Sequence, residues 1–241
     1  MEIGFRGEKI PVTVAPQANA ADALETSLFK DWLNALDSSF ELKSIEIQSV
    51  DKFRTGRVGF IKMICKILRN GIEVPGIVVL RGSAVAMLVI ITDAETKKKY
   101  SILTEQPRVP ASTVLREIPA GMTDGNGNLR GVAIRELEEE CGLTAKPEDL
   151  VDMTQLAYEG KYPGVYSSQG LLDEYIRYFL WNLTLPHEKV QELEGKIGGE
   201  DAHEQIILRL VPFEDIWKIA PDSKTLCSLC LYQQLLASGK I

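Results

Sequence analysis

Residues 121–143 read GMTDGNGNLRGVAIRELEEECGL, and the rest of the chain is organised around this stretch. Asn128–Cys141 has the apolar spacing that is typical of a helix. Glu136, Glu139 and Glu140 share one side of that helix, because residues three and four apart are neighbours on a helix. Three adjacent carboxylates repel one another unless a positive charge joins them.

The acidic run has two interpretations. Charge runs on helices usually form a solvated face, to which Glu138 would also belong. The glycine-rich, turn-prone loop 124–128 favours a cation site instead, since its backbone carbonyls can lie beside the acidic side of the helix. Carboxylate and carbonyl oxygens are the ligands that Mg²⁺ prefers. Gly142 is placed to end the helix in a left-handed conformation.

The same stretch resembles the Nudix box, in which Gly, five residues, Glu and seven residues precede Arg-Glu-aliphatic-x-Glu-Glu-x-Gly-aliphatic. The matching positions are Gly121, Arg135, Glu136, Leu137, Glu139, Glu140, Gly142 and Leu143. Gly127 stands where the pattern has glutamate, which removes one side chain from the loop but leaves the helix carboxylates in place.

The resemblance implies an α+β protein with the Nudix fold, an α/β/α sandwich around a mixed sheet, plus an N-terminal β-rich dimerisation module. Residues 1–80 would form that module and supply part of the base pocket. Residues 81–241 would form the Nudix hydrolase domain. A homodimer is expected on the same ground.

The resemblance also assigns the metal site. Glu136, Glu139 and Glu140, with the backbone carbonyl of Ala120, are the implied ligands of Mg²⁺, and Mn²⁺ is an alternative ion. Arg135 lies four residues before Glu139 and is expected to orient it through an ion pair.

Composition excludes several other classes of protein. The chain has 241 residues, is 45% hydrophobic and carries a net charge of −7 without a long Lys/Arg run, so nucleic acid is a poor partner. No apolar run reaches transmembrane length, so no membrane partner is expected. The Cys227-x-x-Cys230 pair has no second Cys/His pair nearby and favours a core helix over a metal or redox site. Few cysteines indicate a reducing compartment, either the cytoplasm or, for a protein without its transit peptide, the plastid.

The first third of the chain has one helical and several strand-like segments. Asp22–Leu36 is predicted to be an amphipathic helix. The predicted strands are Lys9–Val14, Ser44–Val50, Val58–Ile67 and Ile72–Leu80. Phe53, in the loop between two of these strands, is a candidate to stack on a nucleobase, with a core or dimer contact as the alternative.

The remainder of the chain alternates strands and helices. Ala84–Thr92 is predicted to be a strand covered on both faces, because it is continuously apolar. Further strands are predicted at Lys99–Gln106, Leu150–Ala157, Glu174–Leu183 and Gln205–Val211. The predicted C-terminal helices are Phe213–Ile219 and Ser223–Ala237, the second docking through Leu226, Leu229, Cys230, Leu235 and Leu236.

Two further segments, Leu103–Pro110 and Leu115–Met122, look most like plant-type ADP-sugar diphosphatases. In those enzymes the arginine that corresponds to Arg108 reaches the diphosphate, and a surface arginine is the alternative. Met122 would border the substrate, and Glu117 is either a polar pocket residue or a strand-edge carboxylate.

The general base is expected on a loop. In ADP-ribose-type Nudix enzymes a glutamate just before the last strand takes this role. Glu204, at the end of the polar connection Thr184–Glu204, is the first choice, Glu174 the second and Glu200 the third. His203 adjoins Glu204 and is expected to be an exposed bystander.

The implied reaction is Mg²⁺-dependent hydrolysis of ADP-glucose and ADP-ribose to AMP and a sugar phosphate, so the expected partner is a small nucleotide sugar. One alternative is a diphosphatase for UDP-glucose or another nucleoside-diphosphate sugar. An alternative of another class is a non-catalytic nucleotide-sugar sensor. The intact set of three carboxylates argues against the sensor, since a protein without turnover has no physical need for crowded like charges.

Overall fold

The computed structural model of the chain describes residues 1–123, 125, 127–199 and 205–241, and they divide into two compact units. The first unit consists of Met1–Gly82 and Tyr166–Glu174. The second consists of Ser83–Val165 and Tyr175–Ile241. Each unit has its own hydrophobic interior. The short strand β12 (Val165–Tyr166) lies where the chain passes from the second unit to the first.

The first unit is a strongly paired sheet covered by two short helices. Its strands are β1 (Glu2–Phe5), β2 (Glu8–Val14), β3 (Phe40–Lys52), β4 (Val58–Arg69), β5 (Ile72–Val74) and β6 (Ile77–Leu80). The order is β1-β2-β3-β4-β5, with β6 also on β4, and the β2–β3 pair is parallel while its neighbours are antiparallel. Along β4 alternate residues such as Ile61 and Met63 are buried, while Phe60 and Ile64 face outward.

The helix predicted at Asp22–Leu36 is two helices, α1 (Ala20–Leu24) and α2 (Ser27–Ala35). The break falls at Thr26, whose hydroxyl accepts a hydrogen bond from the Phe29 N–H at 3.1 Å and so caps the start of α2. The apolar periodicity therefore did not show that Thr26, a helix-capping residue, divides the predicted helix in two.

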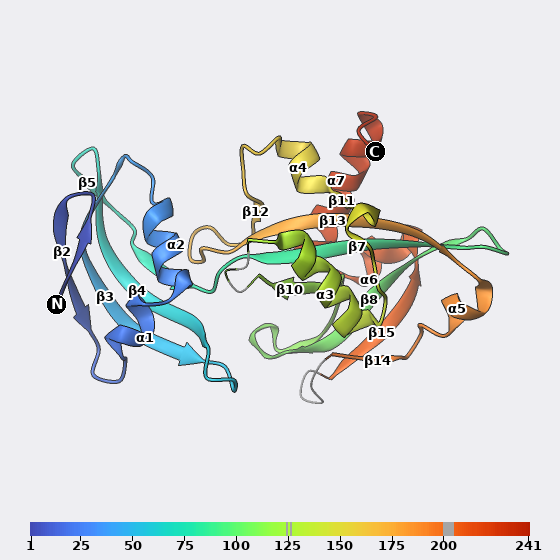
Figure 1. The fold of residues 1–241 in the computed structure, drawn as a ribbon, viewed down its shortest axis with the longest axis horizontal. Helices are drawn as coiled ribbons and strands as arrows, with labels where there is room; N and C mark the ends of the chain where they lie inside the picture. Colours follow the sequence, from blue (N-terminus) through green and yellow to red (C-terminus); the bar gives the residue numbers. More distant parts are fainter. Residues whose placement is uncertain (124, 126, 200–204) are drawn as a thin grey trace. The chain divides into compact units, whose positions relative to one another are not determined.

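The second unit is built on a mixed sheet of order β11-β13-β7-β8-β15-β14, with β9 on β8, and β10 on β7 (Figure 1). Strand β13 runs parallel to β7, and β8 runs antiparallel to both β7 and β15. The strands are β7 (Ala84–Asp93), β8 (Lys99–Arg108), β9 (Thr113–Glu117), β10 (Ala120–Met122), β11 (Leu150–Asp152), β13 (Tyr175–Leu185), β14 (Ile197–Gly198) and β15 (Ile206–Pro212).

Helices cover both faces of this sheet. They are α3 (Leu129–Cys141), α4 (Met153–Tyr158), α5 (His187–Gln191), α6 (Ile216–Ile219) and α7 (Ser223–Ala237), with the 3₁₀ turns η1 (Val109–Ala111), η2 (Pro147–Asp149) and η3 (Phe213–Asp215). Val85 and Met87 of β7 pack in the core that includes α3, whereas Ala86 and Leu88 pack in the core that includes α7. Alternate residues of one strand thus feed two layers, which confirms the predicted α/β/α arrangement around a mixed sheet.

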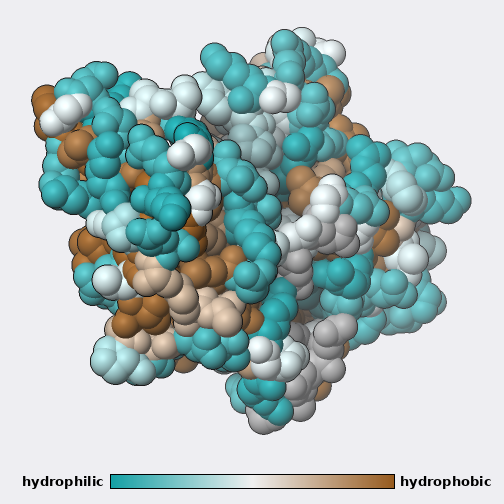
Figure 2. Space-filling view, turned by 60° about the vertical axis from the view of Figure 1, so that its left-hand side comes forward, coloured by the Kyte–Doolittle hydropathy of each residue, from teal (hydrophilic) through white to brown (hydrophobic). Residues whose placement is uncertain are grey.

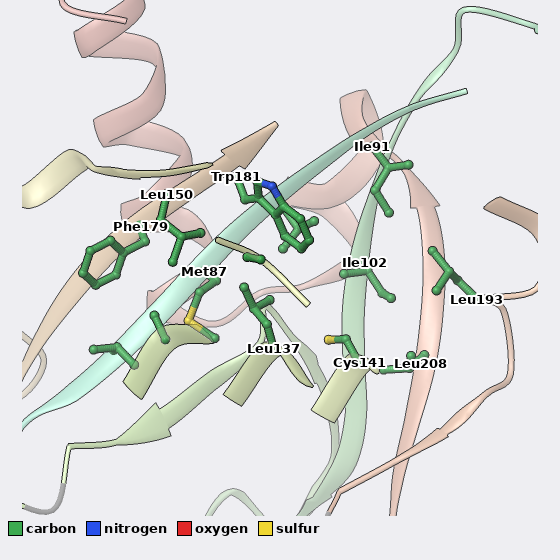
Figure 3. Close-up of a cluster of buried hydrophobic side chains, with 14 of the residues drawn as sticks. Met87, Ile91, Ile102, Leu137, Cys141, Leu150, Phe179, Trp181, Leu193 and Leu208 are labelled. Atoms are coloured by element: carbon green, nitrogen blue, oxygen red, sulfur yellow. The ribbon is translucent and has the colours of Figure 1, made fainter. Parts of the chain in front are cut away.

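The core on the α3 side joins the acidic helix to the sheet. Figure 3 shows Leu137 and Cys141 of α3 directed toward Met87 and Ile102 of the strands, with Trp181 beside them. All five of these side chains are buried. Burial of this apolar side leaves the neighbouring side of α3 for the carboxylates.

Two predictions in the second unit were wrong. Only Leu150–Asp152 of the predicted strand Leu150–Ala157 is extended, because Asp152 accepts the Gln155 N–H at 2.8 Å and begins α4. The predicted apolar side of the last helix was also wrong in part. The side chains of Leu226, Cys230 and Leu236 are exposed.

The surface of the first unit carries exposed apolar residues. They are Met1, Phe60, Ile64, Ile72, Ile77, Tyr166 and Leu171. Figure 2 shows a face of the molecule on which hydrophobic residues gather in one area between hydrophilic ones. No helix in the described part of the chain is both long and apolar enough to cross a membrane.

Candidate active site

Helix α3 begins and ends where the sequence predicts. The side chain of Asn128 accepts the Gly131 N–H at 3.0 Å, and a side chain at position 131 would collide with this cap. At the other end Gly142 has φ 63°, and its N–H donates to the Glu138 carbonyl at 2.9 Å. The acidic residues are thus held on a regular helix with both termini satisfied.

The acidic residues of α3 have different surroundings. Glu140 is only 7% exposed, and its Oε2 accepts the backbone N–H of Ala120 in β10 at 3.1 Å. Glu136 lies against Gly121, where a Cβ atom would overlap its carboxylate. Glu138 is exposed, as expected of a solvated position. The carboxylates of Glu136 and Glu140 therefore face the strand that carries Ala120 and Gly121.

Arg135 links two members of the acidic set. Its Nη2 lies 3.2 Å from Oε1 of Glu136, and its Nε lies 3.4 Å from Oε1 of Glu139. The guanidinium offsets the repulsion between these carboxylates, which lie on one side of the helix.

The oxygen atoms of this site fit a hard divalent cation whose remaining coordination positions a bound ligand would fill. Among the described residues no three His, Cys, Asp or Glu side chains converge as a ready-made metal cage. Mg²⁺ seldom uses such cages, because it binds through one or two carboxylates with water and substrate phosphates completing its shell. Ala120 donates its N–H toward Glu140, and in a strand the N–H and C=O of one residue point to the same side. The carbonyl oxygen of Ala120 therefore lies on the side of the carboxylates.

Arg108 and Glu117 are bound to each other. Arg108 donates from Nε to Oε1 of Glu117 and from Nη2 to Oε2, both at 2.8 Å, in a bidentate pair. These hydrogen bonds raise the pKa of Arg108, and the charge of nearby Glu140 adds to the effect. Arg108 therefore lies within electrostatic reach of the acidic helix, and Glu117 is a buried carboxylate at the end of β9.

Lys224 of α7 is the residue of this cluster that sequence reasoning missed. Its Nζ lies 2.7 Å from Oε2 of Glu117. Burial by itself would raise the pKa of Glu117, but the Arg108 hydrogen bond and the Lys224 charge lower it to about 2. A lysine in the first turn of a C-terminal helix carried no sequence signal that it reaches β9.

Met122 lies at the end of β10, opposite Ala84, and is half-buried. The next residue, Thr123, is buried and tied to Ser83, with 2.7 Å between the two hydroxyl oxygens. These contacts fix the strand just before the glycine-rich loop. No atom of the described residues lies within 4 Å of a Cβ built on Gly127 in that loop, so they leave space for a side chain there.

Phe53 and Glu174 belong to the first unit, where both have partners. The Phe53 ring covers Gly59, its centroid lies 5.8 Å from that of Phe60, and the Arg57 guanidinium lies 5.0 Å from it. Glu174 is buried, accepts a hydrogen bond from the Ser167 hydroxyl and lies 3.0 Å from Nη1 of Arg81.

Glu204, Glu200 and His203 lie outside the described residues, so the structure does not test the expectations placed on them. The described chain just before them does approach α3. The Gly199 N–H donates to the Glu139 carbonyl at 3.0 Å, and Gly198 pairs with Ile206 across β14 and β15. A Cβ atom on Gly198 would overlap the Glu140 carbonyl, so this strand passes directly against the last turn of the helix.

A NUDIX domain model matches residues 82–229, well over half of the chain and the part that contains α3, β10 and the mixed sheet. The chain therefore belongs to the Nudix family, and it is a Nudix hydrolase. It is 38% identical to Nudix hydrolase 14, chloroplastic, of Arabidopsis thaliana over 249 aligned residues, covering 96% of this chain and 79% of that protein.

Two other similarities agree with this family. The ADP-ribose pyrophosphatase of Bacillus subtilis (strain 168) is 29% identical over 155 residues, covering 64% of this chain and 75% of that protein. A crystal structure described as an ADP compounds hydrolase superposes with a TM-score of 0.57 at 16% identity, covering 85% of this chain and 98% of that one. At that identity the structural likeness shows the fold alone, and it confirms the predicted Nudix fold.

Proposed function

We propose that the protein hydrolyses the diphosphate bond of ADP-sugars, ADP-ribose and ADP-glucose among them, to AMP and a sugar phosphate with Mg²⁺. The observation that carries the proposal is the set of carboxylates on α3, of which Glu136 and Glu140 lie against Gly121 and Ala120 of β10. The names of two relatives, a Nudix hydrolase and an ADP-ribose pyrophosphatase, support the reaction and the substrate class.

In this proposal Glu136, Glu139 and Glu140, with the Ala120 carbonyl, hold the cation against the substrate. Bound Mg²⁺ supplies charge neutralisation for the diphosphate oxygens and makes a water molecule more acidic. Arg135 keeps the carboxylates of Glu136 and Glu139 in place through the contacts described above.

Arg108 is proposed to bind the diphosphate. Two of its N–H groups donate to Glu117, which fixes the plane of the guanidinium, and the side chain is still 39% exposed. A planar, pre-oriented guanidinium suits a phosphate group because it offers paired donors. Met122, at the end of β10, is proposed to border the substrate.

Glu204 is proposed as the general base that takes the proton of the attacking water. Gly198 and Gly199, which come shortly before Glu204 in the sequence, contact the last turn of α3, and these contacts support the choice of Glu204. Glu174 is a weaker choice, since its carboxylate already binds Arg81 and Ser167. Glu204→Gln should lower kcat about 10²-fold with little change in KM. A matching loss in Glu174→Gln or in Glu200→Gln, with Glu204→Gln active, would contradict the assignment.

A product assay tests the reaction itself. The protein is incubated with Mg²⁺ and a panel of nucleoside-diphosphate sugars, and nucleoside monophosphate is measured with and without a chelator. AMP from ADP-ribose or ADP-glucose, lost on chelation, is the expected result. UMP from UDP-glucose in excess over AMP would favour the alternative substrate class, and absence of any product would contradict the proposal.

A homodimer through the first unit is proposed with this function. Exposed apolar residues of paired strands, Ile64 on β4 and Ile77 on β6, lie opposite each other in the sheet and support an interface. Sedimentation of wild type and of Ile64→Asp tests it, with a monomeric wild type as the contradicting result. Phe53, in the loop between β3 and β4, is proposed to contribute to the base pocket. Of the two expected compartments, the chloroplastic relative supports the plastid.

A further inference from the structure

The carboxylate of Glu117 binds two different cations although one would satisfy it. Its side chain is nearly inaccessible to solvent, and a buried carboxylate must be paired and hydrogen-bonded. Arg108 alone provides a bidentate partner, with both distances at 2.8 Å. The ammonium group of Lys224 nevertheless also binds Oε2, at 2.7 Å.

We propose that Lys224 is a positioning residue for Arg108, acting through Glu117, so that Arg108 keeps its attraction for the diphosphate of the substrate. The inference rests on the proposed function, because it assigns a further residue to the same site.

Charge explains why a second cation matters here. The Arg108–Glu117 pair by itself is neutral, so an incoming anion would meet a guanidinium backed by a carboxylate. Asp222 lies 3.4 Å from Nζ of Lys224, so the cluster of Arg108, Glu117, Lys224 and Asp222 is neutral as a whole. Without Lys224 it would carry one net negative charge, which disfavours an anionic ligand at the exposed edge of Arg108. Nη1 of Arg108 has no hydrogen-bond partner in the described part of the chain, so it can donate to a ligand.

The position of Lys224 is fixed by the start of α7. Asp222 accepts the backbone N–H of Lys224 at 2.9 Å and lies 3.4 Å from its Nζ. The hydroxyl of the next residue, Thr225, accepts the Ile118 N–H of the neighbouring strand segment at 3.3 Å. Lys224 and Thr225 of α7 therefore bind Glu117 and Ile118, which are also consecutive in the sequence. The Lys224 side chain is 19% exposed, unlike a solvated surface lysine.

Lys224→Met removes the charge and keeps the length of the side chain. We expect KM for ADP-ribose to rise about tenfold with kcat within about twofold of wild type, the order expected when one unit charge near a bound anion is lost. Lys224→Arg restores a cation and should recover most of the KM. Lys224→Gln keeps a donor to Glu117 without the charge, and it serves in place of Lys224→Met if that variant does not fold.

Lys218→Met is the matched control. Lys218 also pairs with a carboxylate, Asp215 at 2.9 Å, but in an exposed pair on the neighbouring helix. The Lys218→Met substitution should leave KM and kcat unchanged. A purely structural role for Lys224 would lower the melting temperature and the fraction of active enzyme without this selective rise in KM and its recovery by arginine.

A binding measurement separates this inference from the proposed function. The dissociation constant of the methylene-bridged analogue of ADP-ribose, which cannot be hydrolysed, is measured by calorimetry for wild type and each variant. It should rise about tenfold in Lys224→Met and recover in Lys224→Arg. Unchanged KM and dissociation constant in a folded Lys224→Met protein would overturn the inference. A wild type that binds the analogue without hydrolysing ADP-ribose would overturn the proposed function alone, and one that does neither would overturn both.

Discussion

At the scale of single residues, Glu140 and Glu138 separate the two interpretations of the acidic run. Glu140 is buried against β10, whereas Glu138 is exposed on the same helix. Glu140→Gln should lower kcat/KM by about 10²-fold or more, because it removes a negative ligand oxygen while the amide oxygen can still accept the Ala120 N–H. Glu138→Gln changes the same functional group and should remain as active as wild type. Equal activity of the two variants in a steady-state assay would remove the metal role from Glu140.

Gly127 tests the one departure from the Nudix box. Within the described part of the chain no atom lies within 4 Å of a Cβ built there, so Gly127→Glu should fold normally, with stability within about 0.5 kcal/mol of wild type. A carboxylate just before the acidic helix should raise kcat/KM several-fold when Mg²⁺ is limiting, because it adds a ligand or a hydrogen-bond acceptor near the cation. Gly127→Gln, of similar shape without the charge, is the control. A Gly127→Glu enzyme that is less active than wild type at every Mg²⁺ concentration would contradict this expectation.

The sequence could predict the residues of α3 because their relation is local. Glu136, Glu139 and Glu140 are placed on one side by helix geometry alone. The partner of Glu117 could not be predicted in the same way. Ile118 and Thr225, whose hydrogen bond lies beside the Glu117–Lys224 pair, are 107 residues apart in sequence, and only tertiary packing brings them together.

At the scale of elements, the contact between β14 and α3 depends on one glycine, Gly198. The backbone of Gly198 lies against the Glu140 carbonyl with no room for a Cβ atom. Gly198→Ala should therefore push β14 away from the last turn of α3, at a cost of about 1–3 kcal/mol of stability. Gly198→Ala should also lower kcat several-fold, because Gly198 and Gly199 hold the chain against α3 shortly before the proposed general base, Glu204.

Gly4→Ala is the control for this substitution. Gly4 lies in β1 with nothing within 4 Å of an added Cβ atom, and it should unfold and turn over like wild type. Chemical unfolding and steady-state kinetics on both variants provide the comparison. A normal kcat in Gly198→Ala would contradict a role for the position of β14 in catalysis.

Element predictions succeeded where one pattern ran uninterrupted and failed where a capping residue interrupted it. Ala84–Asp93 is a strand buried on both faces, as its continuous apolar run predicts. Thr26 and Asp152, by contrast, each begin a helix inside a segment with a single apparent period. A side-chain oxygen that accepts an N–H three residues later therefore outweighed the apolar pattern at both positions.

At the scale of the whole molecule, the division into two units follows contacts that no linear pattern encodes. Residues 166–174 lie far along the chain but pack in the first unit. Asp173 accepts the N–H of Arg81 at 2.8 Å, and Glu174 pairs with the Arg81 side chain. The hydrogen bond between the Arg81 N–H and Asp173 joins residues 92 positions apart in the sequence. Such pairs are visible only in the folded chain.

The stability of the molecule should depend on pH through Asp93 and His187. Asp93 is buried, and hydrogen bonds from His187 and from the Thr96 N–H lower its pKa. The Asp93 hydrogen bond, with 2.7 Å between Nδ1 and Oδ2, raises the pKa of His187 above its ordinary 6.5. A raised histidine pKa contributes stability below pH 6.5 that is lost as the pH rises through the folded value, and a lowered aspartate pKa contributes stability that is lost on acidification.

The pair should therefore stabilise the protein most at mildly acidic pH. His187→Gln keeps a donor to Asp93 but cannot become charged, so it isolates the contribution of the charged ring. The free energy of unfolding, measured in urea, should favour wild type over His187→Gln more at about pH 5.5 than at about pH 8.5. A difference between wild type and His187→Gln that stays constant over this range would mean that the ring of His187 does not become charged in the folded protein, because linkage requires the difference to change wherever the two states bind unequal numbers of protons.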